Sequence, residues 1–138
     1  FETGHALYGY DGLCKNVHGH SYKLSVTISG VPISDPKNKK YGMVMDFGDL
    51  KNIINDIIVN PFDHATVLNV NSPHKELSDN MEAQGHKIVR VQYQPTSEMM
   101  IIDFANKIKN KLPPHVSLER LILRETETCY AEWYADND

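Results

Sequence analysis

The chain has 138 residues, of which 41% are hydrophobic and 23% are charged, and its formal net charge is −4. These values are typical of a globular protein, and we expect residues 1–138 to form a single domain around one hydrophobic core. The negative net charge argues against a nucleic-acid or membrane-surface partner, and no apolar run is long enough to span a bilayer.

The two cysteines, Cys14 and Cys129, are too few for a disulfide framework. We expect both to be free thiols, which fits a reducing compartment and a cytoplasmic protein. The chain does not open with a signal-like segment, and Phe1 already falls within a predicted strand, so we expect native residues before it.

The first predicted element is a β-hairpin. Alternate residues of the segment Phe1–Leu7 share one face, and His20–Ile28 alternates apolar with polar residues, which is the two-residue period of a half-buried strand. His18 and His20 lie on the inward face of the second strand. Gly19 between them allows another backbone or a ligand to approach closely.

His5 falls on the face of the first strand from which it could meet this pair across the hairpin. Three neutral imidazoles with an open fourth position are typical of a catalytic zinc site. A pair of histidines two residues apart is weak evidence alone, because most strand histidines are ordinary packed residues. The third histidine, together with Cys14 four residues before the pair, makes a metal site the favoured interpretation.

Cys14 has three interpretations at this point. It could be a fourth zinc ligand, a small buried apolar residue, or a nucleophile or base. Its position beside Lys15 and near a cation site favours a reactive residue or a ligand over an inert one, and the sequence does not decide between those two.

A turn-rich basic loop over residues 30–40 precedes a short predicted strand over 41–46. Asp46 is a suitable N-cap for a helix whose apolar residues repeat at helical spacing from Phe47 to Ile58, and Asn60–Pro61 should end it. Asp63 and His64 follow. Asp63 could fix the tautomer of a histidine, or His64 could act as a general acid or base, but from the residues alone loop capping is the favoured interpretation.

Residues 70–85 contain many turn formers and no clear period, so we predict a long surface loop. Residues 87–93 then form a strand. A second helix begins at Thr96, which is a suitable N-cap, and its buried stripe runs from Met100 to Leu112.

The last two predicted strands lie at residues 121–125 and 128–134. Glu125 closes an otherwise apolar strand face, where an unpaired carboxylate is costly unless it reaches solvent or receives donors from a ligand. The order of elements, with antiparallel hairpins at both ends, predicts an α+β domain in which two helices cover one face of an antiparallel sheet.

With these residues laid out, the chain resembles the 6-pyruvoyltetrahydropterin synthase / 6-carboxytetrahydropterin synthase family. The resemblance spans nearly the whole chain, and the order and spacing of its motifs are far more specific than any one of them. The motifs are F-x-x-x-H at Phe1–His5, C-x-x-x-H-G-H at Cys14–His20, G-M-V-M-D-F at Gly42–Phe47, D-H at Asp63–His64, P-T-S-E at Pro95–Glu98 and R-E-T at Arg124–Thr126.

The resemblance implies a role for each candidate residue. A Zn²⁺ ion would be held by three imidazoles and the pterin would lie beside it, with Cys14 as the catalytic base. The implied zinc ligands are His5, His18 and His20; the implied relay partners of the thiol are Asp63 and His64; the implied anchor of the pterin's amidine edge is Glu125; and the implied lining of the pterin pocket is Thr96, Ser97 and Glu98.

The resemblance also implies the tunnelling fold, in which trimers close a β-barrel and stack as hexamers with sites between subunits. The implied substrate is 7,8-dihydroneopterin triphosphate. We favour the 6-carboxytetrahydropterin branch of queuosine biosynthesis, because the short gap between Cys14 and His18 resembles that of bacterial members. The alternatives are the 6-pyruvoyl branch and an inactive pterin- or zinc-binding module. Ala6 departs from the family pattern, because many members have Arg at this position.

Overall fold

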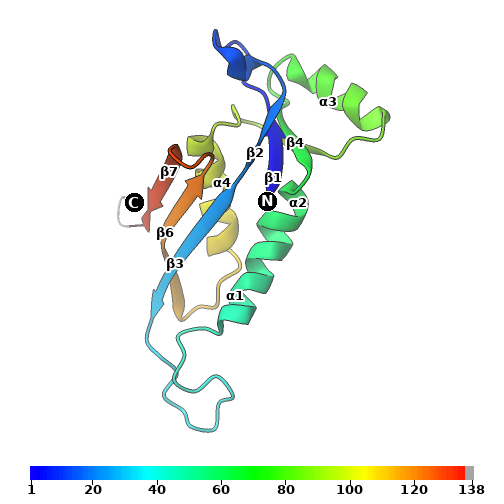
Figure 1. Cartoon of the computed structure of the whole chain (residues 1–138). Helices are drawn as coiled ribbons and strands as arrows, with labels where there is room; N and C mark the ends of the chain where they lie inside the picture. Colours follow the sequence, from blue (N-terminus) through cyan, green and yellow to red (C-terminus); the bar gives the residue numbers. More distant parts are fainter. Residues whose placement is uncertain (136–138) are drawn as a thin grey trace.

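A computed structural model describes residues 1–135 of the chain. The fold contains two small β-sheets with helices packed beside them (Figure 1). The sheets are joined by the extended segment of residues 18–30, whose first part belongs to one sheet and whose second part belongs to the other. The strands are β1 Glu2–His5, β2 His18–Ser21, β3 Lys23–Gly30, β4 Ala65–Asn69, β5 Ile88–Val91, β6 Val116–Arg124 and β7 Tyr130–Tyr134. The helical segments are α1 Phe47–Ile54, the π-helical turn Asn55–Val59, α2 Asn60–Phe62, α3 His74–Ala83 and α4 Ser97–Lys109, with a 3₁₀ turn at Leu13–Lys15.

The strands follow the order β2-β1-β4-β5 in one sheet and β3-β6-β7 in the other. The pairs β1–β2, β3–β6 and β6–β7 are antiparallel, as expected, and the α+β class is confirmed. The pairs β1–β4 and β4–β5 are parallel, which the prediction of an antiparallel sheet did not include. The reason is β4, which is buried on both faces and therefore lacks the alternation by which a strand is recognised in a sequence.

The core lies between α4 and the sheet β3-β6-β7, whose inner face α4 covers (Figure 1). The cap predicted for α4 is confirmed, because the Thr96 hydroxyl accepts a hydrogen bond from the Met99 amide at 3.2 Å. The stripe predicted for this helix is also buried, with Met100, Ile101, Phe104, Ala105 and Ile108 at most 2% exposed. The strong helical period of these residues made α4 predictable.

The first helix begins as predicted, since the Asp46 side chain accepts from the Gly48 amide at 2.7 Å. It does not end at Asn60–Pro61, however, and the helical run continues to Phe62. Within the π turn the Asn60 amide donates to the Asn55 carbonyl five residues back. This wider turn accommodates the proline that would otherwise break the helix. Within residues 1–135, none of the helices combines the length and hydropathy needed to cross a bilayer.

The strand predicted over residues 41–46 is wrong, because turns and bends occupy this segment. Gly42 has φ 83° and its amide donates to the Ile33 carbonyl at 2.8 Å. A positive φ is compatible with a turn and not with an extended strand, so the backbone folds back on the preceding loop here.

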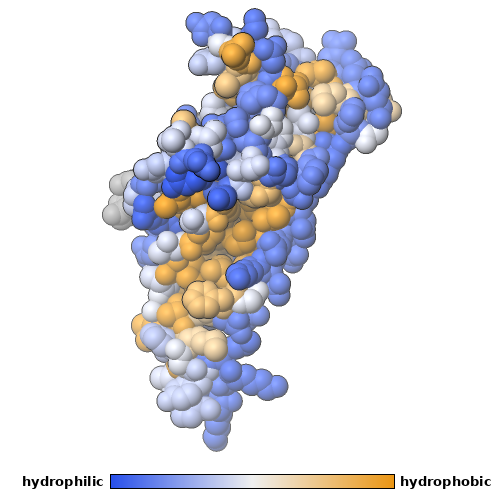
Figure 2. Space-filling view, in the orientation of Figure 1, coloured by the Kyte–Doolittle hydropathy of each residue, from blue (hydrophilic) through white to orange (hydrophobic). Residues whose placement is uncertain are grey.

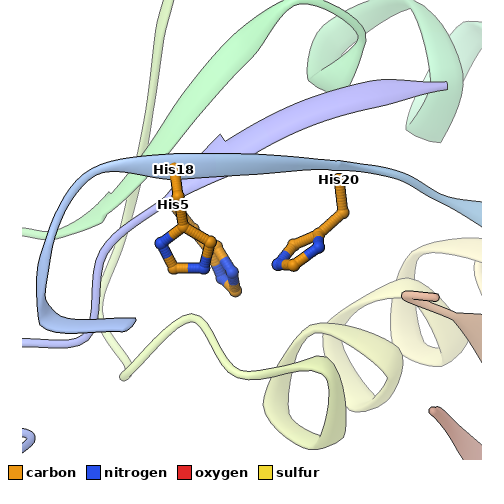
Figure 3. Close-up of side chains that lie close together, drawn as sticks. All are labelled: His5, His18 and His20. Atoms are coloured by element: carbon orange, nitrogen blue, oxygen red, sulfur yellow. The ribbon is translucent and has the colours of Figure 1, made fainter. Parts of the chain in front are cut away.

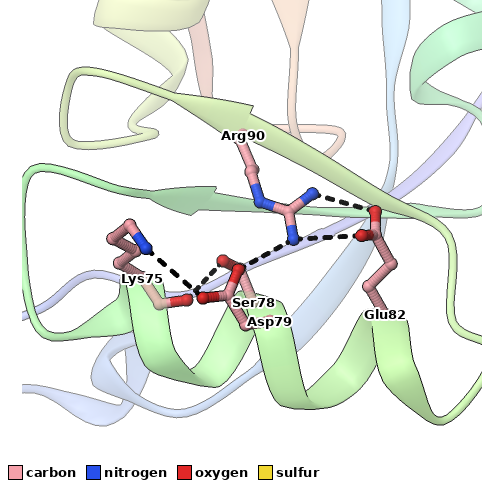
Figure 4. Close-up of polar contacts among 5 residues, drawn as sticks. All are labelled: Lys75, Ser78, Asp79, Glu82 and Arg90. Carbon is pink, nitrogen blue, oxygen red and sulfur yellow. Dashed lines mark hydrogen bonds and ion pairs between the residues drawn. The ribbon is translucent and has the colours of Figure 1, made fainter.

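The surface loop predicted over residues 70–85 is also wrong, because residues 74–83 form α3. Ser78 is the one residue of this helix that is fully buried, so the helix lacks the apolar stripe that would reveal it. Instead, Arg90 of β5 donates to Asp79 at 3.0 Å and to Glu82 at 2.9 Å, and Lys75 reaches Asp79 at 3.4 Å (Figure 4). Polar contacts therefore attach α3 to the sheet.

Candidate metal centre and its surroundings

The hairpin of β1 and β2 brings three histidines to one face. In the antiparallel register His5 lies opposite His18, and Thr3 lies opposite His20. Figure 3 shows the three rings on the same side of the hairpin, pointing toward the segment that leads into α4. A side chain at Gly19 would place its Cβ 3.3 Å from the Thr3 carbonyl oxygen, so glycine allows the close approach of the two strands between the imidazoles.

The three imidazoles form a cluster that could hold a metal ion. One ligand atom from each of His5, His18 and His20 lies within 4.8 Å of the other two. The ring centroids are 4.5 Å apart for His5 and His18, 5.2 Å for His5 and His20, and 5.0 Å for His18 and His20. Three imidazoles leave a fourth tetrahedral position open, which is the arrangement of catalytic sites.

Backbone carbonyls orient two of these rings. His5 Nδ1 contacts the Pro95 oxygen at 2.6 Å, and His18 Nδ1 contacts the Asn16 oxygen at 2.7 Å. A carbonyl can only accept, so each Nδ1 carries the proton and each Nε2 presents a lone pair. The Nε2 atoms of His5, His18 and His20 are all buried without a hydrogen-bond partner. Converging, unpartnered nitrogen lone pairs are costly in a closed protein interior and suit a bound cation.

Burial keeps the innermost imidazole neutral. His5 is 2% exposed, and desolvation lowers the pKa of His5 below its ordinary value. The neighbouring His18 and His20 act in the same direction, whereas the Pro95 carbonyl and the Glu125 carboxylate oppose them. The neutral imidazole is the form that binds a metal.

Glu125 borders the cluster. It follows β6 directly, and its Oε1 lies 3.1 Å from His20 Nε2 and 3.4 Å from His5 Nε2, without hydrogen-bond alignment. The Tyr22 hydroxyl donates to the same oxygen at 3.5 Å. Burial is the larger cause of the raised pKa of Tyr22, and the negative charge of Glu125 is the second. Tyr22 therefore remains a hydrogen-bond donor, and it leaves the second carboxylate oxygen free to accept from a ligand.

Cys14 lies in the loop that joins β1 to β2, within the 3₁₀ turn Leu13–Lys15. Its thiol is half-buried, and both cysteines of the chain are free, as expected. The Leu7 amide donates to the Cys14 carbonyl at 3.0 Å, which closes the loop next to the paired ends of the strands. Cys14 lies outside the three-histidine group, and its loop meets the cluster through the Asn16 carbonyl, which contacts His18 Nδ1 at 2.7 Å.

Asp63 and His64 lie beside the start of β1. His64 Nδ1 is 3.0 Å from Asp63 Oδ2, and the Glu2 amide donates to Asp63 Oδ1 at 2.8 Å. These contacts, with the Glu2 amide as the larger cause, lower the pKa of Asp63. The His64 side chain is 76% exposed and borders a groove whose lining includes Gly4, Gly19 and His20. The His64 amide donates to the Glu2 carbonyl at the start of β1, whereas Cys14 lies in the loop that follows the end of β1, so the two side chains do not meet within residues 1–135 of one chain.

Thr96, Ser97 and Glu98, at the start of α4, have three different environments. Thr96 caps the helix, and Ser97 is buried with its hydroxyl oxygen unpartnered. Glu98 is exposed and borders a separate groove with Trp133 and other β7 residues. The sequence reasoning missed Pro95, because a backbone carbonyl that orients an imidazole leaves no signal in the side-chain pattern.

Comparisons with known proteins identify the family of this chain. The sequence profile described as 6-pyruvoyl tetrahydropterin synthase matches residues 1–136. The 6-carboxy-5,6,7,8-tetrahydropterin synthase of Haemophilus influenzae is 34% identical over 134 residues, covering 96% of this chain and 92% of the relative. The enzyme of the same name from Rickettsia typhi is 35% identical over 135 residues, covering 96% of this chain and 93% of the relative.

A solved structure has the same fold. The 6-pyruvoyl tetrahydropterin synthase of Caenorhabditis elegans superimposes with a TM-score of 0.64 at 23% identity, covering 98% of this chain and 89% of that one. With the profile matching almost the entire chain, the protein belongs to the 6-pyruvoyl tetrahydropterin synthase family.

Proposed function

We propose that this protein is a zinc-dependent 6-carboxy-5,6,7,8-tetrahydropterin synthase of queuosine biosynthesis. It would convert 7,8-dihydroneopterin triphosphate to 6-carboxytetrahydropterin with release of acetaldehyde and triphosphate. The observation that carries the proposal is the convergence of three unpartnered Nε2 atoms beside Glu125, in a hairpin whose connecting loop carries a free thiol. Family membership and the names of the two bacterial relatives support the pterin lyase activity.

The residues present fit a zinc ion. His5, His18 and His20 would hold it through Nε2, because the Nδ1 atoms of two of these rings are already directed at carbonyl oxygens. Bound zinc would supply Lewis acidity toward the side-chain oxygens of the substrate and stabilise the negative charge that develops there.

The protein's own residues would bind the pterin and move protons. Glu125 would accept hydrogen bonds from the amidine edge of the pterin, with Tyr22 holding one carboxylate oxygen. The Cys14 thiolate would remove a proton from the substrate side chain, and His64, oriented by Asp63, would return one. The family resemblance also implies Thr96, Ser97 and Glu98 as pterin contacts. The buried Ser97 hydroxyl has no partner and suits this role, whereas within one chain Thr96 caps α4 and Glu98 borders the groove of β7.

We further propose that the chain acts as a cytoplasmic homo-oligomer, a trimer or hexamer built on a closed β-barrel. Within residues 1–135, β3 and β7 each pair with β6 alone, so both outer edges of this sheet are open. An apolar groove of about 610 Å³ lies between β3 and α1, where Leu24, Val26 and the 82% exposed Phe47 contribute to an apolar patch (Figure 2). Open edges beside apolar surface favour pairing with other copies, and His64 would then reach the thiol of a neighbouring subunit.

Product identification tests the proposed reaction. Purified protein loaded with Zn²⁺ is incubated with 7,8-dihydroneopterin triphosphate, and the products are separated and identified by mass. We expect 6-carboxytetrahydropterin together with acetaldehyde. A 6-pyruvoyl product would instead place the protein in the runner-up branch, the one named in the nematode structure. Absence of turnover by the zinc-loaded protein would favour a pterin- or zinc-binding module.

Glu125→Gln distinguishes two possible roles of the carboxylate that borders the cluster: an anchor for the pterin or a fourth zinc ligand. If Glu125 anchors the pterin, the variant should keep its zinc and lose at least about 10-fold in kcat/KM, because a charge-assisted hydrogen bond to the ligand is replaced by a neutral one. Zinc content is measured by elemental analysis and kcat/KM by product formation. Glu127→Gln, in the adjacent turn, is the matched control. Loss of zinc from Glu125→Gln would identify Glu125 as a fourth ligand.

A further inference from the structure

The loop that carries Cys14 is held by a side chain from a distant part of the chain. This Cys14 loop comprises residues 6–17, between β1 and β2. The Gln94 side-chain amide donates to the Tyr8 carbonyl oxygen at 3.0 Å, across 86 positions of sequence. Within the loop, the Leu7 amide donates to the Cys14 carbonyl at 3.0 Å. Because Tyr8 follows Leu7 directly, the hydrogen bond from Gln94 restrains the part of the loop to which Cys14 is hydrogen-bonded.

The residue after Gln94 orients one imidazole of the three-histidine cluster. The buried Pro95 carbonyl contacts His5 Nδ1 at 2.6 Å and thereby orients the most deeply buried imidazole. The same segment is itself anchored, because Thr96 caps α4 and the Thr96 amide donates to the Gln94 carbonyl at 2.8 Å. Two consecutive residues thus attach the thiol loop and the imidazole cluster to one rigid helix terminus.

A second contact reaches the loop from α3. The Tyr8 ring meets the His74 ring edge to face at a centroid distance of 5.2 Å, and α3 is attached to β5 through Arg90 (Figure 4). At its other end the loop is held by the Asn16 carbonyl, which contacts His18 Nδ1 at 2.7 Å. Between these points the loop is open, since Tyr8 and Tyr10 are each 49% exposed and Leu13 is 86% exposed. The position of the first half of the loop relative to the cluster therefore depends on the contacts at Tyr8, while Asn16 fixes the second half.

We propose that Gln94 is a positioning residue that sets the place of Cys14 relative to the three imidazoles. This inference rests on the proposed function where it concerns turnover, because Cys14 is the base only in that proposal. The inferred effect of Gln94 on the position of the Cys14 thiol does not depend on the reaction, because the hydrogen bond to Tyr8 restrains the loop whether or not Cys14 is the catalytic base. A misplacement of about 1 Å in a catalytic group can cost on the order of 100-fold in rate.

The test measures Cys14 itself. In a Cys129→Ser background, which removes the exposed second thiol, the rate of Cys14 alkylation by iodoacetamide is followed by mass spectrometry. Gln94→Ala removes the side chain, and Gln94→Glu keeps its length but cannot donate a hydrogen bond to a carbonyl. Gln92→Ala, at an exposed position two residues upstream, is the matched control. Zinc content, kcat and KM are measured for each variant.

We expect both Gln94 variants to be alkylated about fivefold faster than the parent, which is the change in loop opening that one lost hydrogen bond produces. Zinc content should be unchanged, kcat should fall by about 10-fold or more, and KM should change little. Gln92→Ala should match the parent in every measurement. A merely structural role for Gln94 would lower the melting temperature without raising the alkylation rate of the folded protein.

Unchanged alkylation in both Gln94 variants would overturn the proposal, as would parent-like behaviour of Gln94→Glu. A drop in kcat that follows loss of zinc, with the alkylation rate unaltered, would show that the segment supports His5 and not Cys14. If the parent protein does not turn over the pterin substrate, the proposed function fails, and the alkylation rates still decide the role of Gln94.

Discussion

Cys14→Ala should abolish turnover of 7,8-dihydroneopterin triphosphate while the protein keeps about one zinc ion per chain, the content of a three-histidine site. The metal would be retained because the convergent nitrogen atoms belong to His5, His18 and His20, and Cys14 lies outside that group. The reaction would be lost because Cys14 is the proposed base that removes the substrate proton. A positioned general base contributes on the order of 10²- to 10⁴-fold to a rate, so the loss should be at least about 100-fold.

The measurement combines elemental analysis for zinc with a product assay at saturating substrate. Cys129→Ala provides the matched control, because this exposed thiol lies in the turn before β7 and should be dispensable for both properties. A Cys14→Ala protein that emerges without zinc would identify the sulfur as a metal ligand. The site would then be a closed tetrahedral centre, and the assigned reaction would have to be abandoned.

His18→Ala should remove the metal and, with it, the activity. His18 is half-buried and sits on a short two-stranded ladder, so the substitution should leave the fold intact, whereas truncating the buried His5 would also open a cavity. Loss of a residue that merely orients a metal ligand weakens metal affinity by about 10- to 100-fold, and loss of a ligand should cost at least about 100-fold.

Thermal unfolding with and without zinc reports this loss independently of catalysis. A ligand present at about 100 times its Kd stabilises the folded state by about 2.7 kcal/mol, so the parent should melt at a higher temperature when zinc is added and His18→Ala should not. His86→Ala, at an exposed position between α3 and β5, should respond to zinc as the parent does. If His18→Ala retained both zinc and the thermal shift, the three-imidazole site would be wrong.

The elements that were predictable are those whose burial differs between their faces. The helix beginning at Ser97 has a continuous apolar stripe, and the hairpin strands alternate around His5 and His20. In contrast, β4 is buried on both faces, and α3 is poor in apolar residues and contacts β5 through Arg90, so neither shows a one-sided apolar pattern in the sequence. Periodicity reports one-sided burial and is silent about elements that are held in other ways.

The sequence by itself determined the chemistry available to the site: three histidines at strand spacing, one cysteine in the loop between them, and a carboxylate that closes an apolar strand face. Only the tertiary structure decided how these groups are arranged. It directs three Nε2 atoms at one point, places Glu125 beside them, and sets His64 beside the start of β1, away from the Cys14 loop. The carbonyl of Pro95 and the amide of Gln94 join the site from far along the chain, because hydrogen bonds to backbone atoms depend on chain geometry and not on residue pattern.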